Sequence, residues 1–250
     1  IVHFGGKRFL IDPMLADQEA YPEVPETTST GRGNPDCDLP CPVESLFDVD
    51  AVIVTHLHFD HFDEVAAKVL PKALTLFSQS EEEAQILRGM GFDDVRVLSG
   101  EGIAFDDVRL YRTKCDHGSS NLVTVDGYKD RGLTEKASGV VFESAAETER
   151  FYLAGDTIYC QLVVDAVEKF KPGIVAVNAA GAQYPLGHLI IMNQYDVRSL
   201  MRRFPTLKVI ATHVEGVSHA TVNRPMLREF AKANQLDQLF VPNNGEVLEF

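Results

Sequence analysis

The heptad at residues 55–61, Thr-His-Leu-His-Phe-Asp-His, constrains this chain more than any other feature. It places three histidines and one aspartate within six residues, a density that ordinary core packing does not explain. The apolar, β-branched residues 50–55 predict a buried strand, and the helical spacing of residues 64–70 predicts a helix. The ligand-type side chains of the heptad therefore lie in a loop between a strand and a helix.

Side chains in an extended loop alternate between two sides, and this alternation sorts the heptad. One side receives the ligand-type residues His56, His58 and Asp60. Leu57 and Phe59 then turn toward the core, and the ring of His61 faces a second metal as the helix begins. Imidazole nitrogen suits zinc, iron or manganese, and a carboxylate beside it favours a harder, more open site than a structural zinc site. The heptad therefore predicts a two-metal hydrolase site.

The pattern His-x-His-x-Asp-His at residues 56–61 resembles the hallmark of the metallo-β-lactamase-fold hydrolases. Members of that family carry further ligands downstream, each placed after a strand. This chain has candidates in the same order: His117 after residues 108–113, Asp156 at the end of residues 151–155, and His213 after residues 209–212. The resemblance covers essentially the whole chain.

This resemblance implies a fold, a ligand set and a pair of cofactors. The fold is of the α/β class, an αββα four-layer sandwich with the metal site at one edge between the sheets, and residues 1–250 form one domain. Two divalent metal ions are implied, with zinc as the first expectation and manganese or iron as alternatives. Asp156 would bridge them. Metal one would be held by His56, His58 and His117, and metal two by Asp60, His61 and His213.

Two departures from the family pattern indicate a branch. His58 stands where the diiron oxygen-reducing members carry glutamate, and Asp156 stands where the zinc β-lactamases carry a cysteine ligand. Residues 10–13 and 155–160 are similar to the branch that contains ascorbate-6-phosphate lactonase and the phospholipase D acting on N-acylphosphatidylethanolamines. Residues 178–182 and 211–219 look most like bacterial members of uncharacterised substrate. Branch membership does not identify the substrate.

The rest of the chain shows a weak internal repeat and four helices. Residues 2–12 and 140–156 each predict a hairpin whose second strand ends in an aspartate, Asp12 or Asp156. Helical spacing predicts helices at 81–90, 161–170, 195–204 and 224–233. The loops at 16–45 and 119–138 are candidate walls of a substrate cleft, and a plain solvated loop is the alternative for each.

Several polar residues are candidates for roles around the metals. For catalysis these are Asp60, Asp156, His188 and His219. The two histidines would orient substrate or transfer a proton, and a hydrogen-bonded structural histidine is the alternative. Acids that would hold the outer N–H of a metal-bound histidine are Asp12, Asp116 and Glu215. Tyr184 and Arg224 are candidate substrate contacts, with a solvated arginine as the alternative.

The composition limits the classes of molecule that this chain is expected to bind. With 23 basic and 37 acidic residues the formal charge is −14, which disfavours nucleic acid because its recognition usually needs a basic surface. No apolar run approaches the ~20 residues of a membrane span. Four spread cysteines predict reduced thiols and a cytoplasmic protein, with a Cys37–Cys41 bridge or metal site as the alternative. The sequence leaves a homo-oligomer open.

These features together predict a metal-dependent hydrolase acting on a small ester, lactone or phosphoester. A water shared by two metals would attack, and Asp156 or a nearby histidine would protonate the leaving group. The alternatives are a metal-dependent nuclease or phosphodiesterase, and a non-catalytic binding module that requires the metal.

Overall fold

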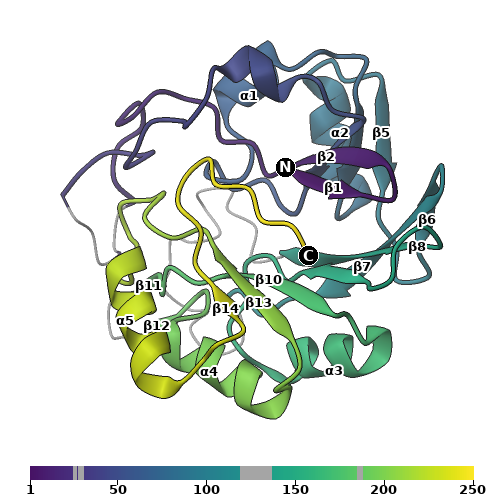
Figure 1. Cartoon of the computed structure of the whole chain (residues 1–250). Coiled ribbons are helices and arrows are strands. Elements are labelled where there is room, and N and C mark those ends of the chain that lie inside the picture. Colours follow the sequence, from purple (N-terminus) through teal and green to yellow (C-terminus); the bar gives the residue numbers. More distant parts are fainter. Residues whose placement is uncertain (25–26, 28–30, 119–136, 185–187) are drawn as a thin grey trace.

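Two β-sheets face each other, and helices cover the outer side of each sheet (Figure 1). The computed structural model describes residues 1–24, 27, 31–118, 137–184 and 188–250. In the described part of the chain, residues 2–97 form one sheet with its two helices, and residues 103–240 form the other sheet with three helices.

The first sheet has five strands in sequence order. They are β1 (Val2–Phe4), β2 (Lys7–Ile11), β3 (Ala51–Val54), β4 (Thr75–Ser78) and β5 (Asp94–Val97). Only the β1–β2 pair is antiparallel, so β2 to β5 end at the same edge. Helices α1 (Glu64–Val69) and α2 (Glu81–Gly89) connect the parallel strands, and a 3-10 turn covers Val43–Leu46.

The second sheet has seven strands in the order β14, β13, β10, β9, β8, β7, β6. Their bounds are β6 (Ile103–Phe105), β7 (Val108–Lys114), β8 (Ser138–Ser144), β9 (Phe151–Leu153), β10 (Ile174–Asn178), β13 (Lys208–Thr212) and β14 (Leu239–Phe240). Strands β9, β10, β13 and β14 are parallel to one another, and the rest pair antiparallel. Its helices are α3 (Gln161–Phe170), α4 (Gln194–Arg203) and α5 (Arg224–Asn234), and a small hairpin is formed by β11 (Gln183–Tyr184) and β12 (His188–Leu189).

Three apolar clusters explain this layering. Between the sheets, Phe9, Phe77 and Phe142 are fully buried and belong to one cluster with residues from both sheets. A second cluster packs α1 and α2 against the outer side of the first sheet, and a third packs α3, α4 and α5 against the second. The order of layers is helix, sheet, sheet, helix, which confirms the predicted αββα sandwich.

Polar caps start the helices where the sequence predicts them. The side chains of Asp63, Ser80, Asn193 and Asn223 each accept a hydrogen bond from a backbone N–H in the first turn. A cap satisfies N–H groups that have no partner within the helix. The predicted helices agree with the observed ones to within one residue at each end.

The predicted internal repeat is also present. Hairpins β1–β2 and β8–β9 are both antiparallel, and the second strand of each pairs in parallel with the next strand of its sheet. Asp12 follows one hairpin and Asp156 the other. The two aspartates therefore reach the same edge of the sandwich from opposite sheets.

Two further sequence predictions, on membrane-spanning segments and on cysteine pairing, can be compared with the described residues. Within these ranges, no helix has the length and apolar character that crossing a membrane requires. Cys37, Cys41, Cys115 and Cys160 are all free thiols, so the alternative of a Cys37–Cys41 bridge is not realised.

Candidate metal centre

Strand ends from both sheets bring the seven ligand-type residues together. The loop after β3 supplies four of them, and the segments after β7, β9 and β13 supply one each. They form three overlapping groups whose ligand atoms lie within 4.8 Å of one another. The first group is His56, His58 and His117, the second is Asp60, His61 and His213, and the third, which overlaps both, is His56, His61 and Asp156.

The first group is an all-histidine cluster. His56 Nε2 lies 2.9 Å from His58 Nδ1, which lies 3.4 Å from His117 Nε2. All three side chains are buried. Three imidazole nitrogens facing one point, with no carboxylate among them, form a typical zinc ligand set.

The second group mixes nitrogen and oxygen. His213 Nε2 lies 3.4 Å from Asp60 Oδ2 and 3.3 Å from His61 Nε2, and His61 Nε2 lies 3.8 Å from Asp60 Oδ2. These three atoms surround a point on the other side of His61 from Asp12. The first and second groups match the two sets that the family resemblance implies.

Asp156 lies between the two groups. Its Oδ2 is 3.1 Å from His61 Nε2, 3.5 Å from His117 Nε2 and 3.8 Å from His56 Nε2. Gly155 permits this position, because its φ is +70° and a Cβ there would lie 2.4 Å from the Ser138 carbonyl oxygen. One carboxylate thus reaches histidines of both groups.

The outer nitrogens of three histidines are also held. His61 Nδ1 lies 2.9 Å from Asp12 Oδ2, and the Asp12 carboxylate in turn accepts from Thr55 N at 2.7 Å and Thr55 Oγ1 at 2.8 Å. His117 Nδ1 donates to the Ile190 carbonyl at 2.8 Å, and His56 Nδ1 lies 3.2 Å from Thr55 Oγ1. Such contacts fix the ring and its tautomer in metal sites. The predicted role of Asp12 agrees with this geometry.

Two polar residues that hold Asp156 were not predicted as part of the site. Asn178 Nδ2 donates to Asp156 Oδ1 at 2.6 Å, and Thr212 Oγ1 donates to Asn178 Oδ1 at 2.8 Å. Asn178 and Thr212 are register partners at the ends of the parallel strands β10 and β13. Their position at strand ends beside Asp156 is the signal that would have identified them.

The charge states of the cluster suit a cation. Burial lowers the pKa of His56, and it lowers the pKa of His58 to about 4, so both rings are neutral with a lone pair to offer. Burial opposes charge on Asp60 and Asp156 as well, but His61 and the other histidines outweigh it and hold both carboxyl pKa values well below the usual range. His56 and His58 are thus neutral beside ionised carboxylates, which are the forms that bind divalent metals, and the donor set fits such ions. Against burial, the neighbouring carboxylates raise the pKa of His61 and His213, so these two rings would release their protons when an ion binds.

His219 and His188 differ in what the structure describes. His219 is buried beside the cluster, where burial lowers its pKa and Asp60 opposes the shift, and its Nδ1 has no hydrogen-bond partner among the described residues. His188 pairs with Tyr184 in the β11–β12 hairpin, and the placement of both side chains lies outside the described part. Their catalytic or substrate-binding roles remain predictions.

The remaining predicted contacts around the site need correction or stay open. Glu215 pairs with Arg224 at 2.6 Å instead of with His213, so Arg224 is engaged within the protein rather than available to substrate. The Phe59 ring packs edge-on against Tyr21, with centroids 5.7 Å apart, and it is partly exposed instead of lying in the core. The backbone N–H of Asp116 donates to Thr157 Oγ1. The role predicted for the Asp116 side chain, holding a metal-bound histidine, stays a prediction. The predicted cleft wall at 119–138 falls mostly outside the described residues.

Comparison with known proteins decides the family. The model of the beta-lactamase superfamily domain matches residues 7–214. The chain belongs to the beta-lactamase superfamily. It is 37% identical over 253 residues to UPF0173 protein YddR of Bacillus subtilis, covering 100% of this chain and 96% of that protein, so this superfamily member also belongs to the UPF0173 family.

Two further relatives connect this superfamily member with hydrolysis. A UPF0173 metal-dependent hydrolase of Rubrobacter xylanophilus is 26% identical, covering 84% of this chain and 74% of that protein. The crystal structure of an isothiocyanate hydrolase from Delia radicum gut bacteria matches with a TM-score of 0.93 and 36% identity, covering 100% of this chain and 95% of the other. The predicted family, fold and hydrolase class are confirmed: the chain is a metal-dependent hydrolase.

Proposed function

We propose that this chain is a two-metal hydrolase of small substrates with an electrophilic carbon. The observation that carries the proposal is the division of seven donors into two groups joined by Asp156. His56, His58 and His117 would hold one ion, and Asp60, His61 and His213 the other. Zinc is the first choice because nitrogen donors predominate, and manganese or iron is the alternative. When bound, such ions would supply a lowered pKa for a water in the site and would polarise the substrate.

The chain's own groups divide the remaining work. Asn178 fixes Asp156 Oδ1, so that Oδ2 faces the histidines. Asp60 has a partner in His213 and is positioned to orient a water by accepting its hydrogen bond. His219 Nδ1 is buried and without a partner among the described residues, so His219 is the better candidate than Asp156 to give a proton to the leaving atom.

The substrate class follows from charge and similarity. A formal charge of −14 disfavours a nucleic acid, and the 36%-identical structure is named an isothiocyanate hydrolase. We therefore place isothiocyanates first, followed by small esters and lactones, and keep phosphoesters, whose electrophile is phosphorus, as the alternative class. Water would add across the C=N bond of an isothiocyanate, its oxygen to carbon and a proton to nitrogen. The resulting thiocarbamate then splits into an amine and carbonyl sulfide.

A substrate panel tests this proposal. Protein loaded with zinc, and separately with manganese, is assayed on benzyl isothiocyanate, an aryl ester, a lactone, a bis-aryl phosphodiester, RNA and DNA. We expect turnover of at least one carbon electrophile, abolished in Asp60→Ala and Asp156→Ala and retained in Asp165→Ala, which removes an exposed aspartate of α3. Cleavage of RNA or DNA alone would contradict the proposal and favour the nuclease.

A further inference from the structure

The backbone that carries His213 is strained. β13 ends at Thr212, and the next residues include two non-glycine residues in the left-handed region, His213 at φ +56° and Glu215 at φ +64°. That conformation is unfavourable for a residue with a Cβ, so surrounding contacts must hold it.

The outer nitrogen of the His213 ring is not held in the way that the outer nitrogen of His61 is. His61, in the same donor group, has its Nδ1 fixed by Asp12, whereas His213 Nδ1 is buried and has no hydrogen-bond partner among the described residues. The position of the His213 Nε2 therefore depends on the backbone of its loop, and on whatever fixes that backbone.

Arg224 is one of the residues that fix this loop from outside, and it is the one that holds Glu215. Further along the loop, Ser218 N donates to Asn34 Oδ1, and the Gly216 carbonyl accepts from Asp36 N. The backbone N–H of Arg224 donates to Glu215 Oε1 at 3.1 Å and its Nη1 donates to Glu215 Oε2 at 2.6 Å. The same guanidinium donates from Nε to the Pro242 carbonyl at 2.7 Å and from Nη2 to Asn244 Oδ1 at 2.5 Å. A guanidinium with partners on three of its nitrogens is rigid and specific in a way that an isolated surface ion pair is not.

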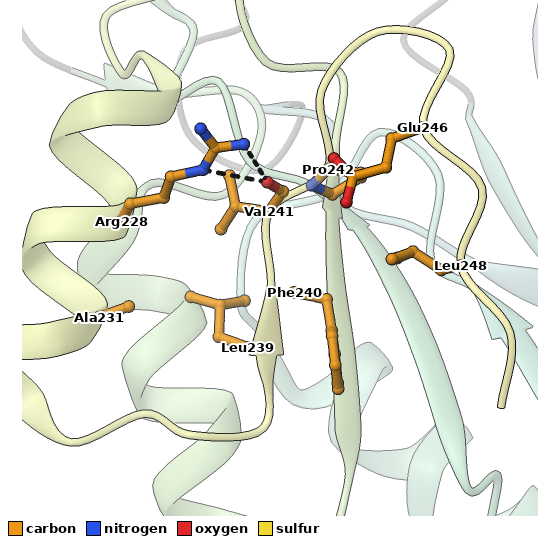
Figure 2. Close-up of a pocket in the computed structure, with 8 residues that line it drawn as sticks. All are labelled: Arg228, Ala231, Leu239, Phe240, Val241, Pro242, Glu246 and Leu248. Atoms are coloured by element: carbon orange, nitrogen blue, oxygen red, sulfur yellow. Dashed lines mark hydrogen bonds between the residues drawn. The ribbon is translucent and has the colours of Figure 1, made fainter.

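The C-terminal segment 241–244 thereby connects to the His213 loop. Asn244 also contacts Cys37 Sγ at 3.5 Å, which ties the segment to the first half of the chain. One turn further along α5, Arg228 holds the same segment by donating to the Val241 carbonyl (Figure 2). Arg228 also lines a pocket of about 320 Å³, and none of the candidate metal ligands lines that pocket. Arg228 donates to the Val241 carbonyl and to Asn243 Oδ1 rather than to Glu215, so the chain offers a matched control.

We propose that Arg224 is a positioning residue: through Glu215 it sets the place of His213 and thereby the affinity for metal two. This inference rests on the proposed ligand assignment. Contacts that orient a ligand typically change metal affinity by about 10- to 100-fold. Arg224→Met and Glu215→Gln should therefore weaken the second binding step at least tenfold and leave the first unchanged.

The test is a titration of metal-free protein with zinc, with cobalt as a spectroscopic probe, in the wild type, Arg224→Met, Glu215→Gln, Arg228→Met and the double variant Glu215→Gln/Arg224→Met. We expect two binding steps in the wild type and in Arg228→Met, a weakened second step in both single variants at Arg224 and Glu215, and no further loss in the double variant. Melting temperatures of the metal-free proteins separate a general loss of fold from a loss at one site.

Three outcomes decide between the proposals. If Arg224→Met binds the second metal ion as tightly as the wild type does, the positioning role is overturned and the two-metal site stands. Equal weakening in Arg228→Met, or equal loss of both steps in Arg224→Met, overturns the positioning role as well, because the effect is then a general one. A wild type that binds no metal overturns the ligand assignment itself.

Discussion

His61 contacts an aspartate through each ring nitrogen. Asp12 lies 2.9 Å from Nδ1 and Asp156 lies 3.1 Å from Nε2. Burial disfavours a charged ring, but the three carboxylates of Asp156, Asp12 and Asp60 outweigh it and raise the pKa of His61 well above its usual value. In the absence of metal the proton on His61 takes the place of a cation between these acids.

The first prediction concerns Asp12. Asp12→Asn keeps the size of the side chain but removes the charge that orients His61, so affinity for the metal bound by His61 should fall about 10- to 100-fold. Zinc titration of the metal-free variant measures this. Asp48→Asn, at an exposed aspartate paired with Arg8, serves as the control and should titrate like the wild type. An unchanged Asp12→Asn would show that the ring is held by packing alone.

The second prediction concerns His219. His219→Gln removes the proposed proton donor while leaving all seven candidate ligands, so kcat should fall about 100-fold or more while metal content stays the same. Steady-state kinetics on the best substrate of the panel, with elemental analysis of the same sample, gives both values. His3→Gln, at an exposed strand position, is the matched control. A fall in metal content with activity would instead assign His219 to metal binding.

The sequence identified the members of the cluster whose chemistry is rare and whose spacing is local, and their role as metal ligands stays a prediction. Three histidines and an aspartate in one loop identify themselves, and the strand that precedes each downstream ligand is readable from its β-branched residues. Asn178 and Thr212 were missed because asparagine and threonine are common, and only the pairing of β10 with β13 brings them to Asp156. The Glu215–Arg224 contact likewise depends on where α5 packs, which no local pattern gives.

At the scale of elements, α1 connects the metal loop to the long loop at 16–45. Asp63 caps α1 by accepting from Ala66 N at 2.7 Å, and its other oxygen accepts from Leu15 N, Ala16 N and the Tyr21 hydroxyl. Burial and Asp63 together raise the pKa of Tyr21 to about 12, so the hydroxyl keeps its proton and donates. One carboxylate thus starts the helix after the heptad and anchors a second loop.

The third prediction compares two helix caps. Ser80→Ala removes a cap on α2 and should lower the free energy of unfolding by about 1 kcal/mol. Asp63→Ala removes an equivalent cap and leaves the buried Leu15 and Ala16 N–H groups without an acceptor, so it should cost about 2–4 kcal/mol. Urea denaturation of both variants measures the difference. Equal costs would mean that water replaces Asp63 at the loop.

The fourth prediction concerns Glu83 of α2. This side chain is 5% exposed, and burial raises its pKa to about 7 against the lowering effects of Gln79 and the Leu57 backbone. Because the pKa is raised on folding, the stabilising contribution is complete below about pH 4.5, the unfolded value, and is lost as pH rises toward 7. Glu83→Gln should remove on the order of 1 kcal/mol of this pH dependence between pH 5 and 8. Parallel urea titrations across that range check it, and identical slopes for both proteins would contradict it.

At the scale of the whole molecule, aromatic rings join the two sheets. Phe142 of β8 packs against Phe4 and Phe9 of the first sheet, with ring centroids 5.8 and 5.3 Å apart. Because this cluster contains residues of both sheets, we propose that residues 1–250 unfold as one unit, as expected for a single domain. The prediction of one domain depends on this test.

The fifth prediction is the effect of Phe142→Ala. Removing a fully buried phenylalanine should cost about 3–5 kcal/mol, and unfolding should remain a single transition because neither sheet keeps a complete core. Met226→Ala, at a side chain 46% exposed on α5, should change stability by about 0.5 kcal/mol or less. Circular dichroism and tyrosine fluorescence followed through urea denaturation test this, and two separated transitions would show two independent halves.

The position of His61 between Asp12 and Asp156 also makes metal binding and sheet packing reciprocal. Asp12 extends from the first sheet and Asp156 from the second. A cation at His61 would therefore be bound fully only when the two sheets are packed in their native arrangement. By mass action, an ion present at 100 times its Kd adds about 2.7 kcal/mol to the free energy of unfolding. The same coupling runs in the other direction. A core substitution that lets the two sheets shift against each other should lower the affinity for the ion, even when it lies far from the ligands. The metal concentration in the cell would then determine how much of this protein stays folded, as well as how much is active.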